Sequence, residues 1–550
     1  MPKENPAVVV ERLKKQKNPW TRFSEIREFA SNGWESIPED WLRTYFRWWG
    51  VYTQGNGEGV LGGSGGEGKT APWFMVRVRI PSGLLTSVQA RVIADLSERY
   101  GRGLADITTR HNIQLHWIRI EDLPDVLEAV QDCGLTTLAA CGDDARNITG
   151  CSLAGLDANE LCDASPLVLQ AAEMLVGAEE FYNLPRKYKV SITGCKVWCC
   201  FPEINDLAFT ATRRGKEVGF SLRVGGGLAS TPHFARRLDA FVRSEQVLPV
   251  VRATTELFRD SDELRESRKR ARLKFLFLKA GWTEERFLDE LHARLPFVLD
   301  PAEPEHEPTS PYRDHVGVHP QKQRGLSYVG ICVPRGRISP EQLRAAANLA
   351  DRFGGGRLRT TTTQNLVVVD VPSSQTDSVV RSLAEWGLAT FASPFARGML
   401  PCTGSEFCKL ALTETKTFAR ALTLELEERL PEYDQPLRIS VTGCPNGCAQ
   451  HAVADIGLEG CKIRVDGRFE DGFSLRVGGS VGAQRVFGQT TGFRCLAEEV
   501  PDVLEGLLRF YLRDQAANQS FRSFLQTTEP TRVGELLSLA LSQRQTVQDV

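Results

Sequence analysis

The octapeptide GFSLRVGG occurs twice in this chain of 550 residues, at 219–226 and at 472–479, a separation of 253 residues. The same separation joins IPSG (80–83) to VPRG (333–336), TTRHN (108–112) to TTTQN (361–365) and CGLTT (133–137) to WGLAT (386–390). SITGCKVWC (191–199) and SVTGCPNGC (440–448) match at a separation of 249. A shared separation over so many segments indicates an internal duplication.

Each copy begins with a strand–helix–strand pattern. In the first copy we predict strands over 73–80 and 107–120 and a helix over 87–101, because apolar residues recur at the corresponding periods. The fold class is therefore α/β (α+β), with two β-α-β halves paired about a pseudo-twofold axis and each followed by a larger α/β lobe. We expect domains at 1–70, 71–140, 141–310, 320–395 and 396–550. Residues 300–315 read as a linker and 498–550 as amphipathic helices.

Composition excludes several classes of protein. The net charge of −2 argues against a nucleic-acid partner, because no half of the chain carries a basic excess. No run approaches 18 apolar residues and the start lacks an apolar signal region, so we expect a cytoplasmic protein with no membrane partner. Fourteen cysteines are too few for a disulfide scaffold and are typical of reduced thiols.

Two cysteine pairs stand out in the second copy. PCTGSEFC (401–408) holds Cys402 and Cys408, and VTGCPNGCAQ (441–450) holds Cys444 and Cys448. Four thiolates are the number that an iron–sulfur cube needs, so we favour a cluster. Zinc and chance cysteines remain as alternatives, although five residues within the first pair are more than structural zinc sites favour.

The first copy lacks this cysteine pattern. It keeps Cys195 and Cys199, but its upstream candidates, Cys141, Cys151 and Cys162, are spaced differently. We therefore interpret Cys195, Cys199 and Cys200 as buried or vestigial thiols, with a second metal site as the alternative.

The first copy instead carries positive charge. Arg77 and Arg110 correspond to Gly330 and Thr363 of the second copy. Arg146 lies in ACGDDARN, and Arg186, Lys187 and Lys189 lie in LPRKYK, where a strand over 187–192 would place both lysines on one face. Buried cations need anions, and a small oxyanion together with a polycarboxylate cofactor would meet that need. A solvated basic patch is the alternative.

A glycine-rich loop needs separate treatment. Residues Gly63–Thr70 satisfy the GxxxxGK[ST] spacing of a phosphate-binding loop. Such a loop opens a helix, whereas here a strand pattern follows at once, so nucleotide binding is disfavoured.

From RWWGVYTQ (47–54) to the second VGG segment, the chain resembles the sirohaem and 4Fe-4S sulfite/nitrite reductases, closest to the ferredoxin-dependent assimilatory sulfite reductases. The resemblance implies ferredoxin-like halves, sirohaem and a 4Fe-4S cluster as cofactors, and a first lobe that binds sirohaem. It implies Cys402, Cys408, Cys444 and Cys448 as cluster ligands, with Cys448 bridging to the sirohaem iron.

The resemblance also assigns the cations. Arg77, Arg146, Lys187 and Lys189 would bind the anion and deliver protons. Contacts to the sirohaem carboxylates would come from Arg110, Asn112, Gln114, His116 and Arg186. His116 has a second interpretation as a satisfied strand histidine.

Substrate and donor are the finer questions. In the family, sulfite reductases carry Lys at the position of Lys189 and nitrite reductases usually carry Asn, so we expect six-electron reduction of sulfite, with nitrite as the alternative. Tyr52 and Cys141 match a Tyr–Cys crosslink of some bacterial members, whereas TGCKVWCC (193–200) departs from the family pattern.

No flavin or NAD(P) domain is visible, so a separate carrier such as ferredoxin should supply electrons to a monomer. Its docking surface is predicted on a charged helical stretch, with Arg268, Lys269, Arg270, Arg272 and Lys274; an exposed helix without a partner is the alternative. Two rivals of other classes remain: a non-catalytic iron–sulfur carrier and a P-loop protein.

Overall fold

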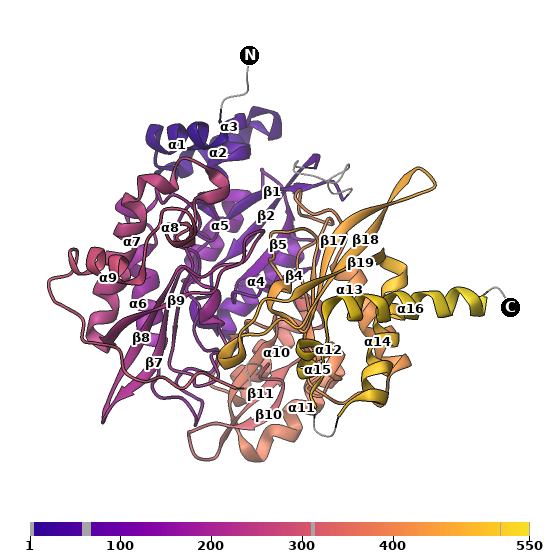
Figure 1. The fold of residues 1–550 in the computed structure, drawn as a ribbon. Helices are drawn as coiled ribbons and strands as arrows, with labels where there is room; N and C mark the ends of the chain where they lie inside the picture. Colours follow the sequence, from indigo (N-terminus) through magenta and orange to yellow (C-terminus); the bar gives the residue numbers. More distant parts are fainter. Residues whose placement is uncertain (1–4, 58–67, 310–313, 517–518, 549–550) are drawn as a thin grey trace.

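The computed structural model describes residues 5–57, 68–309, 314–516 and 519–548. Figure 1 shows the chain path through its helices and sheets. Across the described residues the strands form four sheets, one in each half-domain and one in each larger lobe. The predicted fold class is confirmed, because both copies fold into a mixed α/β half-domain followed by an α/β lobe. The domain limits themselves stay predictions.

The two half-domains exchange edge strands. The first sheet has the order β1 (Val51–Gly55), β2 (Thr70–Val78), β5 (Ile113–Ile118), β4 (Ala105–Ile107) and β12 (Arg337–Ile338). The second has the order β10 (Gly317–Pro320), β11 (Leu326–Ile331), β14 (Leu366–Pro372), β13 (Arg357–Thr360) and β3 (Leu84–Thr86). Thus β3 of the first copy completes the second sheet and β12 of the second copy completes the first. This reciprocal pairing is the pseudo-twofold relation expected from the duplication.

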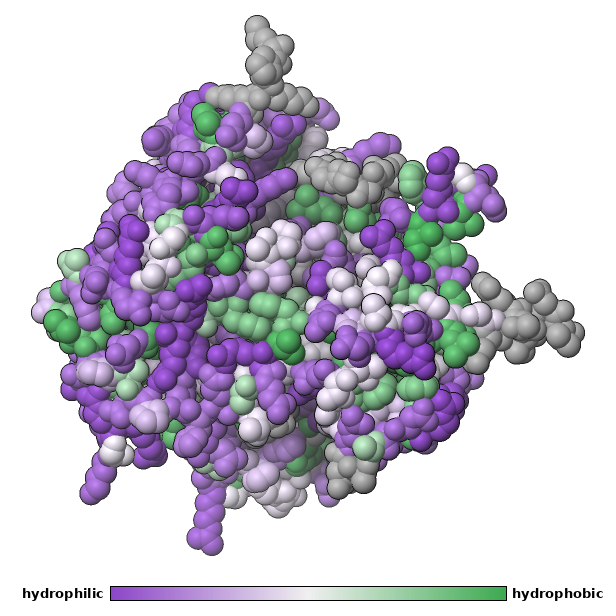
Figure 2. All heavy atoms as spheres, viewed as in Figure 1, coloured by the Kyte–Doolittle hydropathy of each residue, from purple (hydrophilic) through white to green (hydrophobic). Residues whose placement is uncertain are grey.

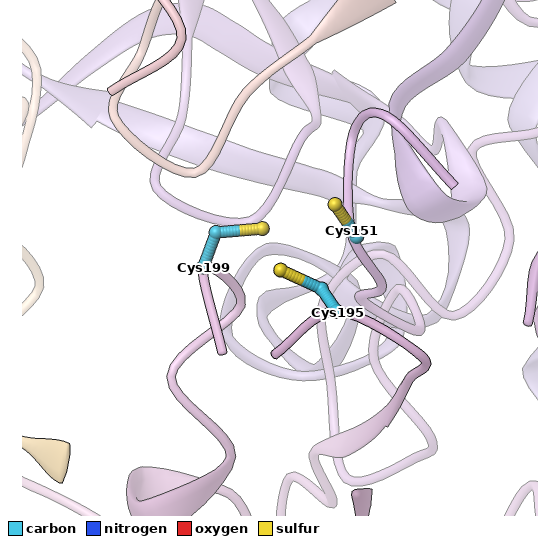
Figure 3. A group of neighbouring side chains, drawn as sticks. All are labelled: Cys151, Cys195 and Cys199. Carbon is cyan, nitrogen blue, oxygen red and sulfur yellow. The ribbon is translucent and has the colours of Figure 1, made fainter. Parts of the chain in front are cut away.

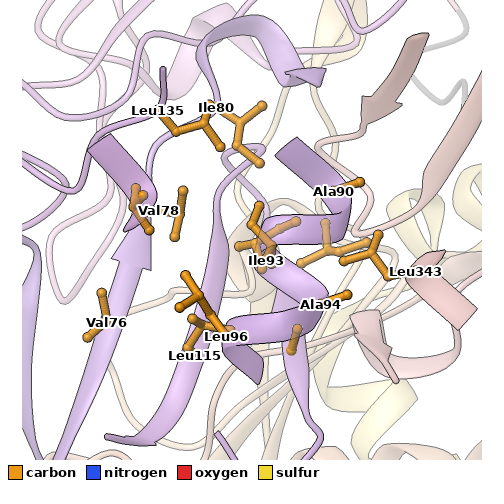
Figure 4. Packing of buried hydrophobic residues seen from close by; sticks show 14 of the residues in the cluster. Val76, Val78, Ile80, Ala90, Ile93, Ala94, Leu96, Leu115, Leu135 and Leu343 are labelled. Atoms are coloured by element: carbon orange, nitrogen blue, oxygen red, sulfur yellow. The ribbon is translucent and has the colours of Figure 1, made fainter. Parts of the chain in front are cut away.

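One helix from each copy lies at the junction of the half-domains. In α4 (Ser87–Tyr100) and α10 (Pro340–Phe353) the first turn is fixed by a capping box, from Thr86 with Gln89 and from Ser339 with Gln342. Figure 4 shows side chains of α4, Leu343 of α10 and the strands of the first sheet meeting in one core. The halves therefore share a single hydrophobic core.

The predicted strands are only partly right. Phe74, Val76 and Val78 of β2 are fully buried, and the predicted helix is α4. The strand predicted over 107–120 is wrong in extent, because TTRHN forms a turn between β4 and β5. Its ends are joined by a hydrogen bond from the Thr108 N–H to the Asn112 carbonyl (2.9 Å).

The TTRHN turn reaches across the pseudo-twofold axis. The ring of His111 is fully buried, with Nδ1 2.8 Å from the Thr360 carbonyl and Nε2 3.2 Å from the Gly150 carbonyl. Its backbone has φ +66°, in the left-handed region. The turn thereby joins the second half-domain to the start of the first lobe.

The TTTQN turn makes the reciprocal contacts. Gln364, at the position equivalent to His111 and with φ +63°, donates from Nε2 to the carbonyls of Ile107 (3.2 Å) and Pro401 (3.1 Å). The two turns clamp the copies together by the same geometry but with different side chains.

Each larger lobe follows its half-domain. The first lobe contains β6 (Val190–Thr193), β7 (Leu207–Arg214), β8 (Glu217–Val224) and β9 (Arg236–Arg243), with α6 (Ser165–Leu175), α7 (Val247–Asp260), α8 (Lys274–Leu278) and α9 (Glu284–His292). The second contains β15 (Met399–Pro401), β16 (Ile439–Thr442), β17 (Ile456–Val465), β18 (Arg468–Val477) and β19 (Gln489–Leu496), with α12 (Pro394–Gly398) and α13 (Lys416–Arg429). The predicted strand over 187–192 therefore starts later, at Val190.

Helices cover the rest. At the N-terminus α1 (Pro6–Gln16), α2 (Phe23–Asn32) and α3 (Glu39–Arg43) pack on the first half-domain, where Phe46 contacts Phe74 with ring centroids 4.8 Å apart. The predicted C-terminal helices are α14 (Val500–Asp514), α15 (Phe521–Thr527) and α16 (Pro530–Gln548). The helix α11 (Thr376–Glu385) covers the second half-domain and α5 (Leu123–Asp132) the first.

The predicted linker between the two copies is fixed to the first lobe. Residues 301–308 have no regular structure, but their acidic side chains bind arginines of the first lobe's sheet. The buried guanidinium of Arg223 lies 2.7 Å from Glu305 and 2.9 Å from Glu307. The linker thus packs along β8 and is fixed there by buried charge pairs.

The surface is that of a polar protein. Figure 2 shows a mostly hydrophilic face on which hydrophobic side chains occur in small separate groups. Among the described residues, no helix is both long enough and apolar enough to cross a membrane.

Candidate active site

The four cysteines of the second copy lie after two neighbouring parallel strands. Cys402 and Cys408 follow β15, and Cys444 and Cys448 follow β16. The Gly443 N–H donates to the Cys402 Sγ (3.2 Å), and the Asn446 side chain donates to the Cys444 Sγ (3.4 Å). Donors aimed at sulfur stabilise thiolates, which is the form that binds iron.

The sulfurs of this group interact electrostatically. Burial raises the pKa of Cys402, Cys408 and Cys444, and the neighbouring thiolate of Cys448 raises each further. The pKa of Cys408 reaches about 12. Iron binds cysteine as the thiolate, so a bound metal would displace the protons that these buried thiols otherwise hold, and four cysteines after two neighbouring strands fit a metal cluster.

Cys448 faces the first copy. It is the exposed member of the four, and its carbonyl accepts a hydrogen bond from the Thr109 hydroxyl (3.2 Å) of the TTRHN turn. Lys187 lies close enough that the Cys448 charge acts on it, although burial and Arg186 lower the Lys187 pKa to about 7. Cys448, the last of the four cysteines, therefore lies close to the cations of the first copy.

Two of the predicted anion-binding arginines share one backbone carbonyl. Arg77 Nη1 lies 3.2 Å and Arg146 Nη1 3.0 Å from the Ala140 oxygen. Arg77 Nη1 also lies 3.0 Å from the Cys141 Sγ, and its guanidinium lies 5.9 Å from the centre of the Tyr52 ring. Tyr52 also raises the pKa of Arg146, against the effect of burial. The structure thus brings together Arg77, Arg146, Tyr52 and Cys141.

Lys187 and Lys189 lie half-buried beside Tyr188, whose side chain is fully buried. The backbone N–H of Lys189 donates to the Asp206 carboxylate (2.8 Å), which Arg272 also binds through two contacts of 2.9 and 2.7 Å. Burial, Arg110 and Arg272 hold the pKa of Lys189 well below its usual range. Within the described part of the chain neither lysine forms an ion pair with a carboxylate, so the site has an excess of positive charge.

The predicted sirohaem contacts divide into two groups. Arg110 binds the Asn205 side chain and the Asn147 carbonyl (2.7 Å each), and Arg186 binds Asp143 (3.2 Å). Gln114 pairs with Arg77 in the β2–β5 register, and Asn112 closes the TTRHN turn. These four stay near the cationic group.

His116 lies elsewhere. Its ring is fully buried, with Nε2 3.1 Å from Asp106, and it stacks on Phe407 with centroids 3.8 Å apart. Asp106 is itself paired with Arg337 at 2.9 Å. The His116 Nδ1 has no hydrogen-bond partner among the described residues, so only Nε2 is satisfied. The stacking on Phe407 favours the second interpretation in part, a strand histidine that packs the half-domain against the CTGSEFC loop.

Buried polar atoms test whether an anionic cofactor fits. Arg110 Nε and Arg146 Nε have no hydrogen-bond partner among the described residues, although the Asp144 carboxylate lies 3.6 Å from Arg146 Nε. Unpaired guanidinium nitrogens in a region with excess positive charge are costly unless an anion compensates them. The residues present therefore fit a polycarboxylate group such as sirohaem.

The predicted docking helix is wrong. Residues 265–281 form short turns and α8 rather than one helix. Arg272 is buried on Asp206, and the buried Lys274 donates to the carbonyls of Gly227 (3.3 Å), Leu228 (2.8 Å) and Thr231. Arg268 binds Asp143, which leaves only Lys269 and Arg270 exposed among the five. Arg268, Arg272 and Lys274 instead bind groups of the protein itself and so support the framework of the site.

Two further expectations concern single segments. Residues 63–67 of the glycine-rich loop lie outside the described residues, and Thr70 opens strand β2 rather than a helix. Cys195, Cys199 and Cys200 are buried as predicted.

Sequence reasoning missed several residues of the site. Thr109 binds the Cys448 carbonyl, Asp206 engages Arg272, and Asp143 gathers Arg186 and Arg268. Asp143 could be suspected from its place in ACGDDARN, but its partners lie 43 and 125 residues away in the chain.

A cavity of about 230 Å³ lies at the second copy's counterpart of the cationic group. It is lined by residues that include Thr363, equivalent to Arg110, and Arg438, equivalent to Lys189.

Comparisons with known proteins agree with the duplicated architecture. The family described as "Nitrite and sulphite reductase 4Fe-4S domain" matches residues 141–298 and 393–543, and "Nitrite/Sulfite reductase ferredoxin-like half domain" matches 67–133 and 319–386.

Individual relatives match over most of their length. A ferredoxin–nitrite reductase of Synechococcus elongatus is 39% identical over 90% of this chain and 95% of its own. The sulfite reductase (ferredoxin) 2 of Mycolicibacterium paratuberculosis is 38% identical over 90% of both chains. The solved structure of the Mycobacterium tuberculosis NirA protein superposes with a TM-score of 0.89 at 34% identity, covering 95% of this chain and 97% of that one.

Proposed function

Because the chain belongs to the nitrite and sulphite reductase family of sirohaem and 4Fe-4S oxidoreductases, we propose that it reduces sulfite to sulfide with six electrons from ferredoxin or a similar small carrier. Relatives of similar identity bear both names, so the family alone does not choose the substrate. Reduction of nitrite to ammonia by the same residues is the alternative.

The observation that carries the proposal is the meeting of the two copies at one site. Arg77, Arg146, Lys187 and Lys189 come from the first copy, and Cys448 comes from the second. Asp206 is already bound by Arg272, and neither Lys187 nor Lys189 forms an ion pair among the described residues, so these lysines can neutralise an added oxyanion. Sulfite as a dianion gains more from them than nitrite does.

Each group of residues has a distinct task. Cys402, Cys408, Cys444 and Cys448 would hold the cluster, and Arg110, Asn112, Gln114 and Arg186 would hold sirohaem carboxylates. When bound, the coupled cofactors supply electrons one at a time to the substrate. The side chains of Arg77 and Arg146 orient the anion. Lys187 and Lys189, whose pKa values are lowered by burial, also orient it and donate protons as its oxygens leave as water.

The test compares two substrates and two variants. Steady-state reduction of sulfite and nitrite by the purified protein with a reduced viologen should favour sulfite. Lys189→Asn should lower kcat/KM for sulfite by more than tenfold and for nitrite by less. Lys196→Asn, at an exposed lysine of the same lobe, serves as the matched control. Equal losses on both substrates would remove Lys189 as the discriminating residue.

The two rival classes of protein would give different experimental results. A non-catalytic iron–sulfur carrier would lack sirohaem Soret absorbance, and a P-loop protein would bind Mg-ATP in a way abolished by Lys69→Ala. A monomeric state and a cytoplasmic location stay predictions, to be measured by sedimentation and by cell fractionation.

A further inference from the structure

Three cysteines of the first copy converge in a second sulfur site. The Sγ atoms of Cys151, Cys195 and Cys199 all lie within 4.8 Å of one another, and all three side chains are buried. Figure 3 shows the three sulfurs pointing toward a common point, Cys151 from one segment and Cys195 and Cys199 from another. We propose that these thiolates bind one zinc ion, separate from the cluster and sirohaem.

The fold explains why these cysteines meet. In the second lobe Leu400 pairs with Ser440, and Cys402 follows two residues later. In the first lobe Thr149 pairs with Ser191 in the same parallel manner, and Cys151 follows two residues later. Cys151 is therefore the structural equivalent of Cys402.

The neighbouring hydrogen bonds keep this alignment. The Leu161 N–H donates to the Gly194 carbonyl (2.8 Å), as the Leu412 N–H does to the Gly443 carbonyl (2.7 Å). Cys195 and Cys199 match Cys444 and Cys448, whereas the position of Cys408 is taken by Asp157. The first copy thus retains three of four sulfur positions.

Sulfur spacing distinguishes a single ion from a cluster. With zinc–sulfur bonds of about 2.3 Å, two thiolates on one tetrahedral ion lie about 3.8 Å apart. The three sulfurs of the first copy lie within 4.8 Å of one another, an upper limit somewhat above that separation, whereas no three of the second copy's cysteines come within 4.8 Å of one another among the described residues. A cube spreads its thiolates over separate irons, so the compact group fits one ion and the wider group fits a cluster.

The surroundings favour a buried metal–thiolate centre. Apolar side chains enclose the sulfurs, among them Leu153, Leu156 and Val367. The guanidinium of Arg359 is buried close enough to Cys151 for their charges to interact, and its Nε has no hydrogen-bond partner among the described residues. Three thiolates and Zn²⁺ carry one net negative charge, which Arg359 would offset.

Zinc is the metal that this donor set favours. Three soft thiolates grouped this closely favour zinc over oxygen-binding cations. Each thiol gives up its proton as the ion binds, and an exogenous ligand such as water would take the fourth position. The ion would tie the 194–200 loop to the segment that begins at Cys151.

The experiment measures metal in the purified holoenzyme. Zinc and iron per chain are determined by mass spectrometry after dialysis against EDTA, for wild type, Cys195→Ser and Cys199→Ser. The matched control is Cys162→Ser, a nearby half-buried cysteine outside the group. We expect about one zinc per chain in wild type and control, a loss of at least tenfold in the other two, and unchanged cluster iron.

Zinc K-edge absorption on wild-type protein provides a test that does not depend on folding of the variants. It should give zinc–sulfur distances near 2.3 Å from three sulfurs. The proposal is overturned by wild-type protein that lacks zinc, by zinc surrounded only by oxygen or nitrogen, or by zinc content that both substitutions leave unchanged.

Discussion

Replacing His111 by glutamine tests the reciprocal clamp between the two copies. His111 and Gln364 hold equivalent positions with φ of +66° and +63°, and each contacts one carbonyl of the other copy and one carbonyl of its own copy. A neutral imidazole carries one N–H for its two carbonyls, whereas a glutamine amide carries two. His111→Gln should therefore be at least as stable as wild type at pH 7.5, with a gain of up to about 1 kcal/mol.

The pH dependence of the free energy of unfolding gives a larger and more specific prediction. Burial lowers the pKa of His111 to about 4, whereas an unfolded histidine titrates near 6.5. Between these values the unfolded chain binds more protons, so this contribution to stability is complete above pH 6.5 and falls as the pH drops toward 4. From pH 7.5 to pH 5 the loss is about 2 kcal/mol in wild type and absent in His111→Gln.

The assay is urea unfolding at both pH values, with the free-energy difference between the two proteins as the readout. Titrations common to both proteins cancel in that difference. His111→Ala is the control that removes the contacts, and it should cost about 2–4 kcal/mol at pH 7.5. Parallel pH profiles for wild type and His111→Gln would refute a neutral, buried histidine at the clamp.

Three further outcomes are expected. Cys448→Ser should abolish magnetic coupling between cluster and haem, measured by electron paramagnetic resonance, and nearly all turnover; wild-type turnover would contradict its bridging role. Peptide mass spectrometry of wild type purified in air should find Tyr52 joined to Cys141 with the loss of two hydrogens, with dioxygen as the two-electron oxidant, and Tyr52→Phe should yield separate peptides. Asp143→Asn should cost about 3–5 kcal/mol at pH 7 in thermal or urea unfolding, because it leaves buried cations unpaired. Neighbouring cations, chiefly Arg268, hold the pKa of Asp143 far below its usual range despite burial, so its contribution is present above about pH 4 and falls at lower pH; an unchanged acid limb in Asp143→Asn would contradict this.

Repetition made much of the architecture predictable from sequence. The common separation of 253 residues predicted paired halves, and the cysteine pairs pointed to the segments after β15 and β16. Both inferences rest on short sequence motifs, which can be recognised without knowing the three-dimensional structure.

Long-range contacts were the part that sequence did not reveal. Arg272 and Lys274 read as a surface helix, but their partners are Asp206 and the 227–231 carbonyls, 43 residues or more away. For His116 the sequence left two interpretations open, a sirohaem contact and a satisfied strand histidine, because its stacking partner Phe407 comes from the other copy. The equivalence of Cys151 with Cys402 was hidden because the separation shortens to 251 residues there, and only strand pairing restores the register.

The exchanged edge strands have a consequence for how such a chain could arise. A single copy alone would lack the strand that completes its sheet, since β3 and β12 each serve the opposite half. Two identical copies would each supply the edge strand that the other lacks, which would give a strand-swapped homodimer with two equal sites. Joining the two copies in one chain keeps the architecture and lets the two sites evolve separately. One copy can then acquire basic side chains while the other acquires the cysteines that bind iron.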